Sequence, residues 1–464
     1  MSLLTQNPVR GGGWATGREL SWSSLVSQHR TWIAAAYAVC GLFGLGVVLV
    51  SSDYLHRDWG LMAACGYGLA AVAVLAWRSH GTDLALGLSV CGALVVPLFW
   101  MAATGQGQPE VAVIIRSAEL LVHHGTPYEP ANVLKHTTNP NAYDPYLPAM
   151  TFFALLWTVA PHFVLADPRV WFGAAFVACF ALALRVAKAR DVARWTVFVT
   201  ATPIIAFELA VGGTDVPIIA LICLGFALMW KYPQPILAGL AFGGAASMKA
   251  TAWPAVIVAI ALALARDGKR AAAIMTAVSL SVFAVLVGPF AAVEPGSLVK
   301  NTILFPLGLA SVTSQAVSPL PGHLIAETGH VGRLCVIAAL ILTAIAIGAS
   351  LIFRPPQHVP AAATRLIVAL TVMFVLAPAT RFGYFIYPGG ILVWLLLCLL
   401  TQPAYFAPDG LGPPPDPGIS GRLPPRRPAS APTQKHLEPL ESQGTLEPQQ
   451  RQTPTGSMAP LSRL

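Results

Sequence analysis

Long apolar stretches recur along the whole chain and leave little room for a soluble fold. A helix that crosses a bilayer needs about 17 to 25 mostly apolar residues, and in lipid its backbone groups must be satisfied within their own segment. Of the 464 residues, 55% are hydrophobic and only 10% are charged. The sequence therefore predicts an all-α polytopic membrane protein with about twelve or thirteen transmembrane helices. The predicted segments begin near Thr31, Gly60, Leu84, Pro148, Pro168, Arg194, Val216, Ile236, Ala252, Ala271, Leu334, Leu366 and Tyr384.

Both ends of the chain are polar and are expected to lie outside the membrane domain. No small-residue cleavage site follows the first apolar run at signal-peptide distance, so we expect a retained helix rather than a cleaved leader. Residues 1–28 are expected to be a disordered cytoplasmic segment. From Gln402 onward the chain is rich in Pro and poor in large apolar residues, so it cannot offset its chain entropy by burial. The sequence thus predicts a transmembrane domain over 29–401 and a disordered cytoplasmic tail over 402–464.

The net charge of +8 could indicate a nucleic-acid partner, but the basic residues are spread over short loops and the two ends. Because Lys and Arg in loops set the orientation of a membrane protein, we expect the lipid bilayer as a partner and no nucleic acid. All cysteines fall inside apolar runs, where they form neither a loop disulfide nor a clustered metal site. We expect no metal centre and no cofactor. The cysteines are Cys40, Cys65, Cys91, Cys179, Cys223, Cys335 and Cys398.

The distribution of Lys and Arg predicts a cytoplasmic N-terminus. With that orientation a polar segment over 109–147, the first polar loop, lies outside the cell. A later basic cluster would then also lie outside, against the rule. We therefore expect one apolar run within 148–250 to be re-entrant, and the best candidate is Trp195–Val211, which is interrupted by Pro203. The cytoplasmic side is favoured by Arg10, Arg18, Arg30, Arg78, Arg266, Lys269 and Arg270, whereas the conflicting cluster is Arg185, Lys188, Arg190 and Arg194.

The first polar loop holds a large share of the acids and histidines of this chain. Its apolar residues recur at three- and four-residue spacing, which predicts an amphipathic helix at the membrane surface. Gly125 and Pro127 then end that helix. Glu110 lies at the N-terminal end, where the helix dipole favours a carboxylate, so it is either a helix cap or a catalytic acid. The apolar positions are Val111, Ile114, Ile115, Ala118, Leu121 and Val122.

Turn signals and aromatic residues fill the end of this loop. Tyr143, Asp144 and Tyr146 lie between Asn139 and Pro148, directly before the next apolar run. Tyrosines at this depth usually anchor a helix at the membrane interface. The alternative is a platform under a bound lipid or sugar, and both interpretations stay open.

Further charged groups lie in apolar surroundings. Lys249 lies where two short hydrophobic runs meet, and an ammonium there is costly unless it is paired. It is either a functional residue or a side chain that reaches the interface. Glu208 and Asp215 are candidate partners for it or ordinary loop acids. Arg381 starts the last predicted helix beside Tyr384, and an arginine there could bind phosphate.

A second polar loop is predicted over 292–333. It is too polar to face lipid, so it covers a cavity or faces solvent. His323 lies in its turn-rich part on the same predicted side as Glu110. A solvated loop histidine is the alternative to a functional one.

Several catalytic patterns are missing from the sequence. We find no phosphate-binding loop, no nucleophile elbow, no zinc-protease motif and no Asp-x-Asp pair that would hold a metal-bound nucleotide sugar. The sequence therefore disfavours an enzyme that uses a nucleotide-activated donor.

The order of the short motifs resembles a known family. An acid at 110, Arg116-Ser117-Ala118-Glu119-Leu120, Gly125-Thr126-Pro127-Tyr128 and the Gly212-Gly213-Thr214-Asp215 turn are followed by the segment around Lys249 and by the segment from Thr380 to Pro388. Together they resemble the GT-C integral-membrane glycosyltransferases, specifically glycosyltransferase family 87, the polyprenol-phosphate-mannose-dependent mannosyltransferases of actinobacteria. The resemblance covers roughly residues 85 to 400 and rests on motif order and spacing.

This resemblance implies a GT-C-like bundle and a role for particular residues. The family's outward-facing acid, usually aspartate, maps to Glu110, its lysine maps to Lys249, and a late-loop histidine maps to His323. The longer glutamate side chain departs from the family pattern and leaves Asp144 and Asp215 as reserve candidates for the base. Apolar helices before the first polar loop are a second departure.

The resemblance also implies a reaction. A hexose, most simply mannose, would move from a polyprenyl-phosphate donor to an extracytoplasmic glycolipid or glycan acceptor with inversion, at the outer face of the plasma membrane. Glu110 would be the general base, and Lys249, Arg381 and His323 would bind phosphate. Substrate-binding roles would also fall to Tyr128, Tyr143, Tyr146, Asp144 and Asp215. A transporter or flippase for a lipid-linked sugar and an inactive relative are the alternatives.

Overall fold

The computed structural model describes residues 22–401 with the exception of 78–79, 162 and 313. Within this part of the chain the regular structure is helical, and one isolated β-bridge joins Val317 and Thr380. The predicted fold class is therefore confirmed: the chain is an all-α polytopic membrane protein. The tail predicted from 402 lies outside the described residues, as do residues 1–21. Residues 22–28 are helical, which corrects the expectation that all of 1–28 is disordered.

Every predicted apolar segment corresponds to a helix or a pair of helices. The helices are α1 (Trp22–Val50), α2 (Tyr54–Ala76), α3 (Gly81–Val90), α4 (Val96–Ala103), α5 (Pro109–His124), α6 (Ala131–His136), α7 (Leu155–Val159), α8 (Pro168–Val186), α9 (Val192–Thr200), α10 (Pro203–Val211), α11 (Val216–Leu228), α12 (Pro235–Ala246), α13 (Trp253–Leu262), α14 (Lys269–Val293), α15 (Pro295–Val299), α16 (Pro321–Glu327), α17 (His330–Phe353), α18 (Val359–Leu376) and α19 (Ile386–Thr401).

Among the described residues, nine helices are long and apolar enough to cross a membrane. They are α1, α2, the continuous pair α3 and α4, α8, α13, α14, α17, α18 and α19, some of them extended by short turns. A bent pair, α9 and α10, would make a tenth, and three shorter apolar helices cover Pro148–Val159, Val216–Leu228 and Pro235–Ala246.

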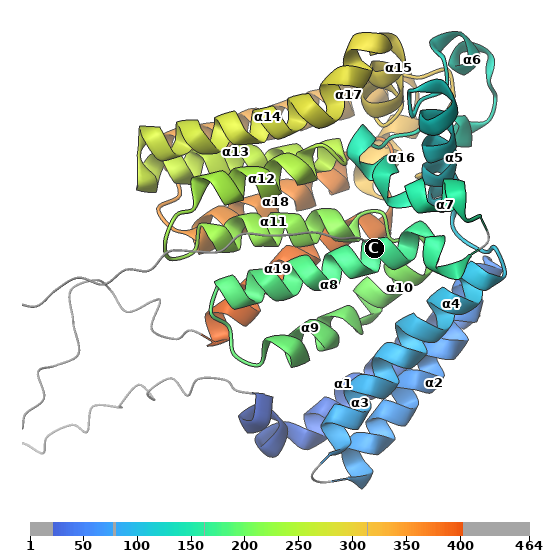
Figure 1. The fold of residues 1–464 in the computed structure, drawn as a ribbon, viewed down its shortest axis with the longest axis vertical. Helices are drawn as coiled ribbons and strands as arrows, with labels where there is room; N and C mark the ends of the chain where they lie inside the picture. The colour runs from blue at the N-terminus through green and yellow to red at the C-terminus, as the bar shows by residue number, and fades with distance from the viewer. Residues whose placement is uncertain (1–21, 78–79, 162, 313, 402–464) are drawn as a thin grey trace, which may run out of the picture. The chain divides into compact units, whose positions relative to one another are not determined.

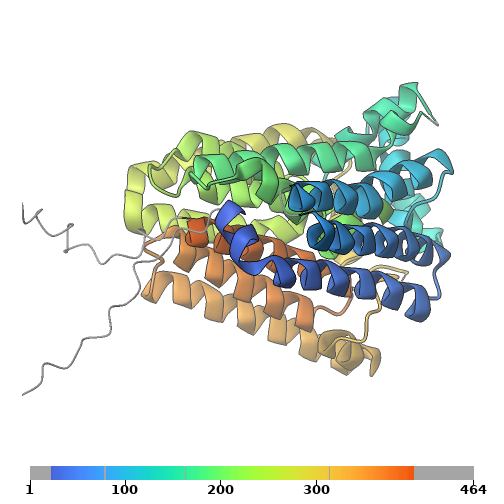
Figure 2. The same cartoon turned by 90° about the horizontal axis from the view of Figure 1, so that it is seen from below.

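The short helices α5, α6, α15 and α16 gather at one end of the bundle, which we call the site end (Figure 1). Figure 2 shows the same segments together at one end after a quarter turn. The first polar loop and the second polar loop therefore meet in space although helices α7 to α14 separate them in the sequence.

The bent pair α9 and α10 crosses the bundle, and the expectation that Trp195–Val211 is re-entrant is wrong. Its start lies at the end opposite to the site, where Arg194 is paired with Asp83 at the beginning of α3. Its end lies at the site end, where the carbonyl of Val211 accepts a hydrogen bond from the backbone N–H of Gln108. The axis bends by 62° at the break, where Pro203 cannot continue the helical hydrogen bonds.

Pro148–Val159 is the apolar segment that remains at one end. The backbone N–H of Leu147 bonds to the carbonyl of Met248 at the site end. The segment then packs beside α5, and α8 begins at that same end, where Arg169 donates to the carbonyl of Ala210 at 2.8 Å. The segment starts as a 3₁₀ helix over Pro148–Ala154, a form that is used in short pieces.

With this path of the chain, the positions of the positive charges no longer conflict with the predicted orientation. The basic cluster after α8 lies at the end opposite to the site, together with the basic residues that follow α13 and α17. Acidic side chains are concentrated at the site end instead. The described basic residues of the opposite end are Arg30, Arg185, Lys188, Arg190, Arg194, Lys231, Arg266, Lys269, Arg270, Arg354 and Arg365.

Two short helices at the centre carry the site. Nearly all of α11 is buried, as expected for a helix that is apolar all round, and Figure 1 shows it between α8, α12 and α19. Helix α12 packs on α14 through Gly239 and Gly243, where an added Cβ would lie 2.8 Å from the carbonyl oxygen of Met275 and 2.9 Å from that of Ser279. Glycines spaced four apart allow such close backbone contact in membranes.

Candidate active site

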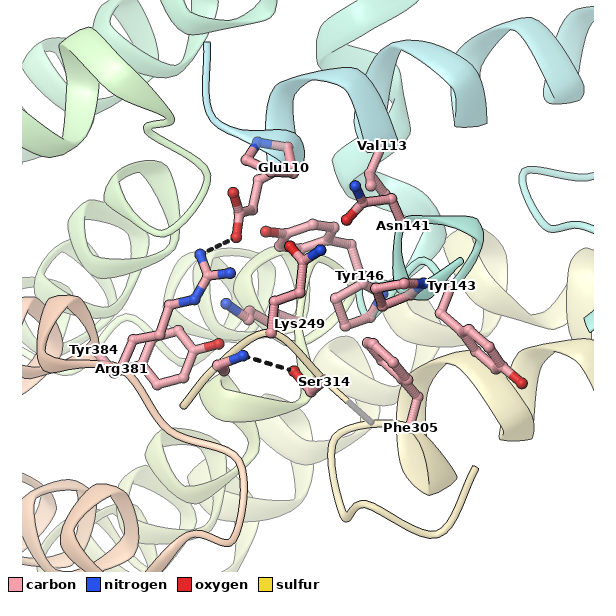
Figure 3. A pocket seen from close by; sticks show the side chains of 15 residues that line it. Glu110, Val113, Asn141, Tyr143, Tyr146, Lys249, Phe305, Ser314, Arg381 and Tyr384 are labelled. Atoms are coloured by element: carbon pink, nitrogen blue, oxygen red, sulfur yellow. Dashed lines mark hydrogen bonds and ion pairs between the residues drawn. The ribbon is translucent and has the colours of Figure 1, made fainter. Parts of the chain in front are cut away.

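A small polar pocket of about 60 Å³ opens at the site end (Figure 3). Its walls come from segments far apart in the sequence: the start of α5, the turn before Pro148, the turn after α12, the second polar loop and the turn before α19. Lining side chains with polar groups are Glu110, Asn141, Tyr143, Tyr146, Lys249, Ser314, Gln315, Arg381 and Tyr384.

Glu110 lies in the first turn of α5 and points toward Arg381 (Figure 3). The predicted amphipathic helix is observed as α5, and it ends at Gly125 in the left-handed conformation (φ 73°). The Oε1 atom of Glu110 pairs with the guanidinium of Arg381. Its Oε2 atom is buried and has no hydrogen-bond partner among the described residues. The carboxylate is therefore held by a partner from the other end of the chain, and one oxygen is free to accept a proton.

Lys249 follows α12 and is buried at the bottom of the pocket. Its ammonium donates to Asp215 Oδ1 at 2.6 Å. It also lies 5.1 Å from the ring centre of Tyr146 and 4.9 Å from that of Tyr384, distances that suit a cation–π interaction. Because an ammonium has three donors, Lys249 keeps capacity for an anion in the pocket while Asp215 holds it.

Asp215 is itself fixed from a second direction. The hydroxyl of Tyr387 donates to Asp215 Oδ1 at 2.9 Å, and Thr251 donates to the Tyr387 hydroxyl at 2.9 Å. This network ties α11, α13 and α19 together behind Lys249. A buried ion pair that is hydrogen-bonded from a second side in this way holds its cation in one position.

The aromatic residues of the turn before Pro148 form one wall. Tyr143 stacks on Phe305 of the second polar loop, with ring centres 4.7 Å apart. The hydroxyl of Tyr146 bonds to that of Thr214 at 3.0 Å, and burial raises the pKa of Tyr146 well above its ordinary value, so the phenol is neutral. Both rings are rigidly held and present their faces or edges to the pocket.

Asp144 is buried behind this wall and does not line the pocket. Its Oδ2 accepts from the Ser117 hydroxyl at 2.6 Å, and its Oδ1 accepts from the Tyr146 N–H at 2.9 Å. Its own N–H donates to Asn301 at 2.7 Å. Burial raises the pKa of Asp144 to about 6, against the opposing effect of the Ser117 hydrogen bond. Asp144 thus joins α5, the aromatic turn and the second polar loop.

Four of the residues expected to bind substrate lie outside the pocket lining. Asp144 accepts from the Ser117 hydroxyl, Asp215 accepts from Lys249, and the hydroxyl of Tyr128 donates to the Tyr146 carbonyl at 2.8 Å. Both nitrogens of the His323 ring have partners: Nδ1 lies 2.9 Å from the Pro378 carbonyl oxygen, and Nε2 lies 3.1 Å from Glu327 Oε1. These four do not line the pocket and their substrate-binding roles stay predictions, whereas Glu110, Lys249, Arg381, Tyr143 and Tyr146 line it together.

The structure also adds residues that the sequence did not single out. Gln108 holds the start of α5 through its backbone bond to Val211, and its side chain lies 3.1 Å from the His56 ring at the start of α2. Phe305 and Gln315 complete the pocket from the second polar loop. The sequence offered one sign of Gln108, a polar side chain directly before Pro109. Nothing in the sequence around Phe305 distinguishes it from a core phenylalanine.

An apolar groove of about 610 Å³ continues from the polar pocket. It runs between α13, α17 and α18 into the depth of the bundle. The pocket and the groove share the wall residues Pro145, Lys249, Phe305, Ser314, Ala316 and Tyr384. A polar head at Lys249 and a long apolar chain in the groove could therefore belong to one molecule.

No group of three His, Cys, Asp or Glu side chains that could hold a metal ion is found among the described residues. The carboxylates nearest the pocket, Glu110 and Asp215, are each paired with a basic side chain.

Comparisons with known proteins agree with the character of this site. A search of the curated proteins and a search of the solved structures found no match. The family model of glycosyltransferase family 87 matches residues 145–378, which include Lys249, the apolar groove and most of the membrane helices. The chain belongs to glycosyltransferase family 87.

Proposed function

We propose that this membrane glycosyltransferase moves a hexose, most simply mannose, from a polyprenyl-phosphate donor to a hydroxyl of a glycolipid or glycan acceptor. The observation that carries the proposal is the continuity of the polar pocket with the apolar groove at Lys249 and Tyr384. A sugar phosphate that is linked to a lipid needs both environments side by side. A donor that carries its own leaving phosphate also needs no nucleotide-binding motif.

In the proposed reaction Glu110 is the general base. Its free oxygen accepts the proton of the acceptor hydroxyl while the hydroxyl oxygen bonds to the anomeric carbon. The bond from that carbon to the phosphate oxygen breaks, and the configuration inverts. The polyprenyl phosphate leaves with one more negative charge than it had in the donor. Lys249 and Arg381 stabilise that charge because they are held in place before it develops.

The charges of the bundle support an extracytoplasmic active site. Basic residues collect at the end opposite to the pocket, and loops rich in Lys and Arg face the cytoplasm. The pocket then faces outward in the plasma membrane, where lipid-linked sugars are the donors that need no cytoplasmic nucleotide.

The test supplies membranes that contain the protein with radiolabelled polyprenyl phosphomannose and measures transfer to endogenous acceptors. Glu110→Gln should reduce the rate by about 10²- to 10⁴-fold, the usual contribution of a general base. Glu119→Gln is the matched control because Glu119 is exposed on the same helix and lies outside the pocket lining.

Equal transfer by wild type and Glu110→Gln would contradict the role of Glu110. If the wild-type protein transferred sugar from no lipid donor but moved a lipid-linked sugar between leaflets, the transporter alternative would replace the proposal.

A further inference from the structure

The floor of the apolar groove combines two small residues with two larger aliphatic side chains. Lys249 marks the mouth, and Val258 on α13 lies nine residues further along, which is roughly 14 Å deeper at 1.5 Å per residue. On α18 the deepest lining residue is Ala369, and on α17 the deepest are Gly348 and Leu351. We call Val258, Gly348, Leu351 and Ala369 the groove floor.

Helix α17 leaves this space open because its middle does not pack closely. Its buried residues are Gly332 and Val336 near the site end and Leu351 near the other end. Between them Leu340, Ala344 and Ile347 line the groove. The groove is therefore bounded at depth by the place where Leu351 returns to the bundle.

Gly348 is the position at which a larger side chain would most easily fill the deep end of the groove. A Cβ added to Gly348 would meet no atom within 4 Å, although the residue lines the groove. Glycine in a helix interior is less favourable than alanine. Gly348 therefore does not stabilise helix α17 itself. One turn earlier on the same face lies Ala344, and across the groove lies Ala369. Small residues on facing walls keep the deep end wide.

We propose that Gly348 and Ala369 set the length of prenyl chain that the enzyme recognises. This inference rests on the proposed polyprenyl-phosphate donor. Each isoprene unit that enters the groove removes apolar surface from contact with the bilayer's mobile chains and packs it against fixed walls. Units beyond the groove floor remain in the lipid and add nothing to recognition.

The experiment uses the purified full-length protein in detergent micelles and synthetic polyprenyl phosphomannose donors of graded chain length. For the wild type, the donor KM should fall as the chain lengthens and then level off once the floor is reached. In Gly348→Phe the levelling should occur at a shorter chain, because a ring now fills the deep end. The ratio of the KM for the longest donor to the KM for the shortest should rise about tenfold, which corresponds to about 1.4 kcal/mol of lost van der Waals packing.

Two further variants make the result specific. Ala369→Phe fills the same space from the opposite wall and should shift the levelling in the same direction. Gly87→Phe is the matched control: Gly87 is an exposed helix glycine of α3 whose added Cβ would also meet no atom within 4 Å, and it lines neither the pocket nor the groove. Its chain-length profile should equal that of the wild type.

Unchanged levelling in active Gly348→Phe and Ala369→Phe proteins would overturn the inference, as would an equal shift in Gly87→Phe. Should Gly348→Phe be inactive with every donor, the profile of Ala369→Phe decides. Failure of the wild type to use any lipid donor would instead refute the proposed function, so the two failures are distinct.

Discussion

The charges that reach the polar pocket are paired before any substrate is present. Glu110 is held by Arg381, and Lys249 is held by Asp215. In the proposed reaction a donor phosphate would attract the guanidinium of Arg381 away from the carboxylate. Both oxygens of Glu110 would then be able to accept a proton at the moment when the donor is in place. This exchange links donor binding to activation of the base.

The capping alternative for Glu110 can be judged at this scale. A cap would bond to the exposed N–H groups of the first turn of α5, but the carboxylate of Glu110 pairs with Arg381, which lies just before the last helix. The sequence indicated an important acid and an important arginine separately. It could not indicate that they meet, because side-chain direction depends on tertiary packing.

Asp144 should make stability depend on pH. Burial raises its pKa in the folded protein to about 6 from an ordinary value of 3.8. A carboxyl with a raised pKa destabilises the folded state above that pKa, and the penalty decreases as the pH falls from about 6 toward 4. Asp144→Asn should therefore raise the free energy of unfolding by on the order of 2 to 3 kcal/mol near pH 7 and by little near pH 4.

The measurement is the thermal unfolding midpoint in detergent as a function of pH. Ser117→Ala serves as the control, because it keeps the buried carboxyl and removes a hydrogen bond that supports its charged form; it should lower the midpoint at neutral pH. If the unfolding midpoint of the Asp144→Asn protein changed with pH in the same way as that of the wild type, this account would be contradicted.

At the scale of the elements, the effect of a glycine substitution in α12 on stability depends on whether that glycine faces α14. An added Cβ at Gly243 would lie 2.9 Å from the Ser279 carbonyl oxygen, whereas one at the adjacent Gly244 would lie 3.8 Å from Leu221. Gly243→Ala should destabilise the protein by about 1 to 3 kcal/mol through overpacking. Gly244→Ala should be neutral or stabilise slightly, by up to about 1 kcal/mol, because alanine favours the helix.

Thermal unfolding of both variants in the same detergent tests this difference. Because α12 ends three residues before Lys249, Gly243→Ala should also raise the donor KM. Equal midpoints for the two neighbouring substitutions would mean that α12 and α14 are not in backbone contact.

The elements show where sequence patterns are informative and where they stop. Apolar run length located the apolar helices, although only nine of the thirteen predicted segments are helices long and apolar enough to cross a membrane among the described residues, and the spacing of Val111 and Ala118 identified α5. Run length could not tell that α9 and α10 cross while Pro148–Val159 stays at one end. That outcome depends on packing against α5 and α8, and the hydropathy of a segment does not indicate which helices it packs against.

At the scale of the whole molecule, the helices that precede α5 contact the start of that helix at the site end. The family model begins at residue 145, whereas α1 to α4 precede it. One of their contacts at the site end is made by His56, whose ring lies 3.1 Å from the side chain of Gln108. Gln108 lies two residues before Glu110, so these helices brace the start of α5.

The sidedness of the molecule gives a prediction for intact cells. Glu327 is 60% exposed at the site end, and Gln357 is exposed in the turn between α17 and α18 at the other end. Glu327→Cys should react with a membrane-impermeant maleimide in intact cells, and Gln357→Cys should react only after permeabilisation. Labelling of the unsubstituted chain gives the background. The reverse pattern would place the pocket in the cytoplasm.

The groove between α13, α17 and α18 has a kinetic consequence. A donor whose tail lies among these helices would arrive by lateral diffusion within the leaflet, never through bulk water. Its effective concentration is then a mole fraction of the membrane rather than a molarity. Adding inert phospholipid at constant total donor should slow the enzyme by surface dilution, and rates measured in different vesicles become comparable only when donor is expressed per lipid.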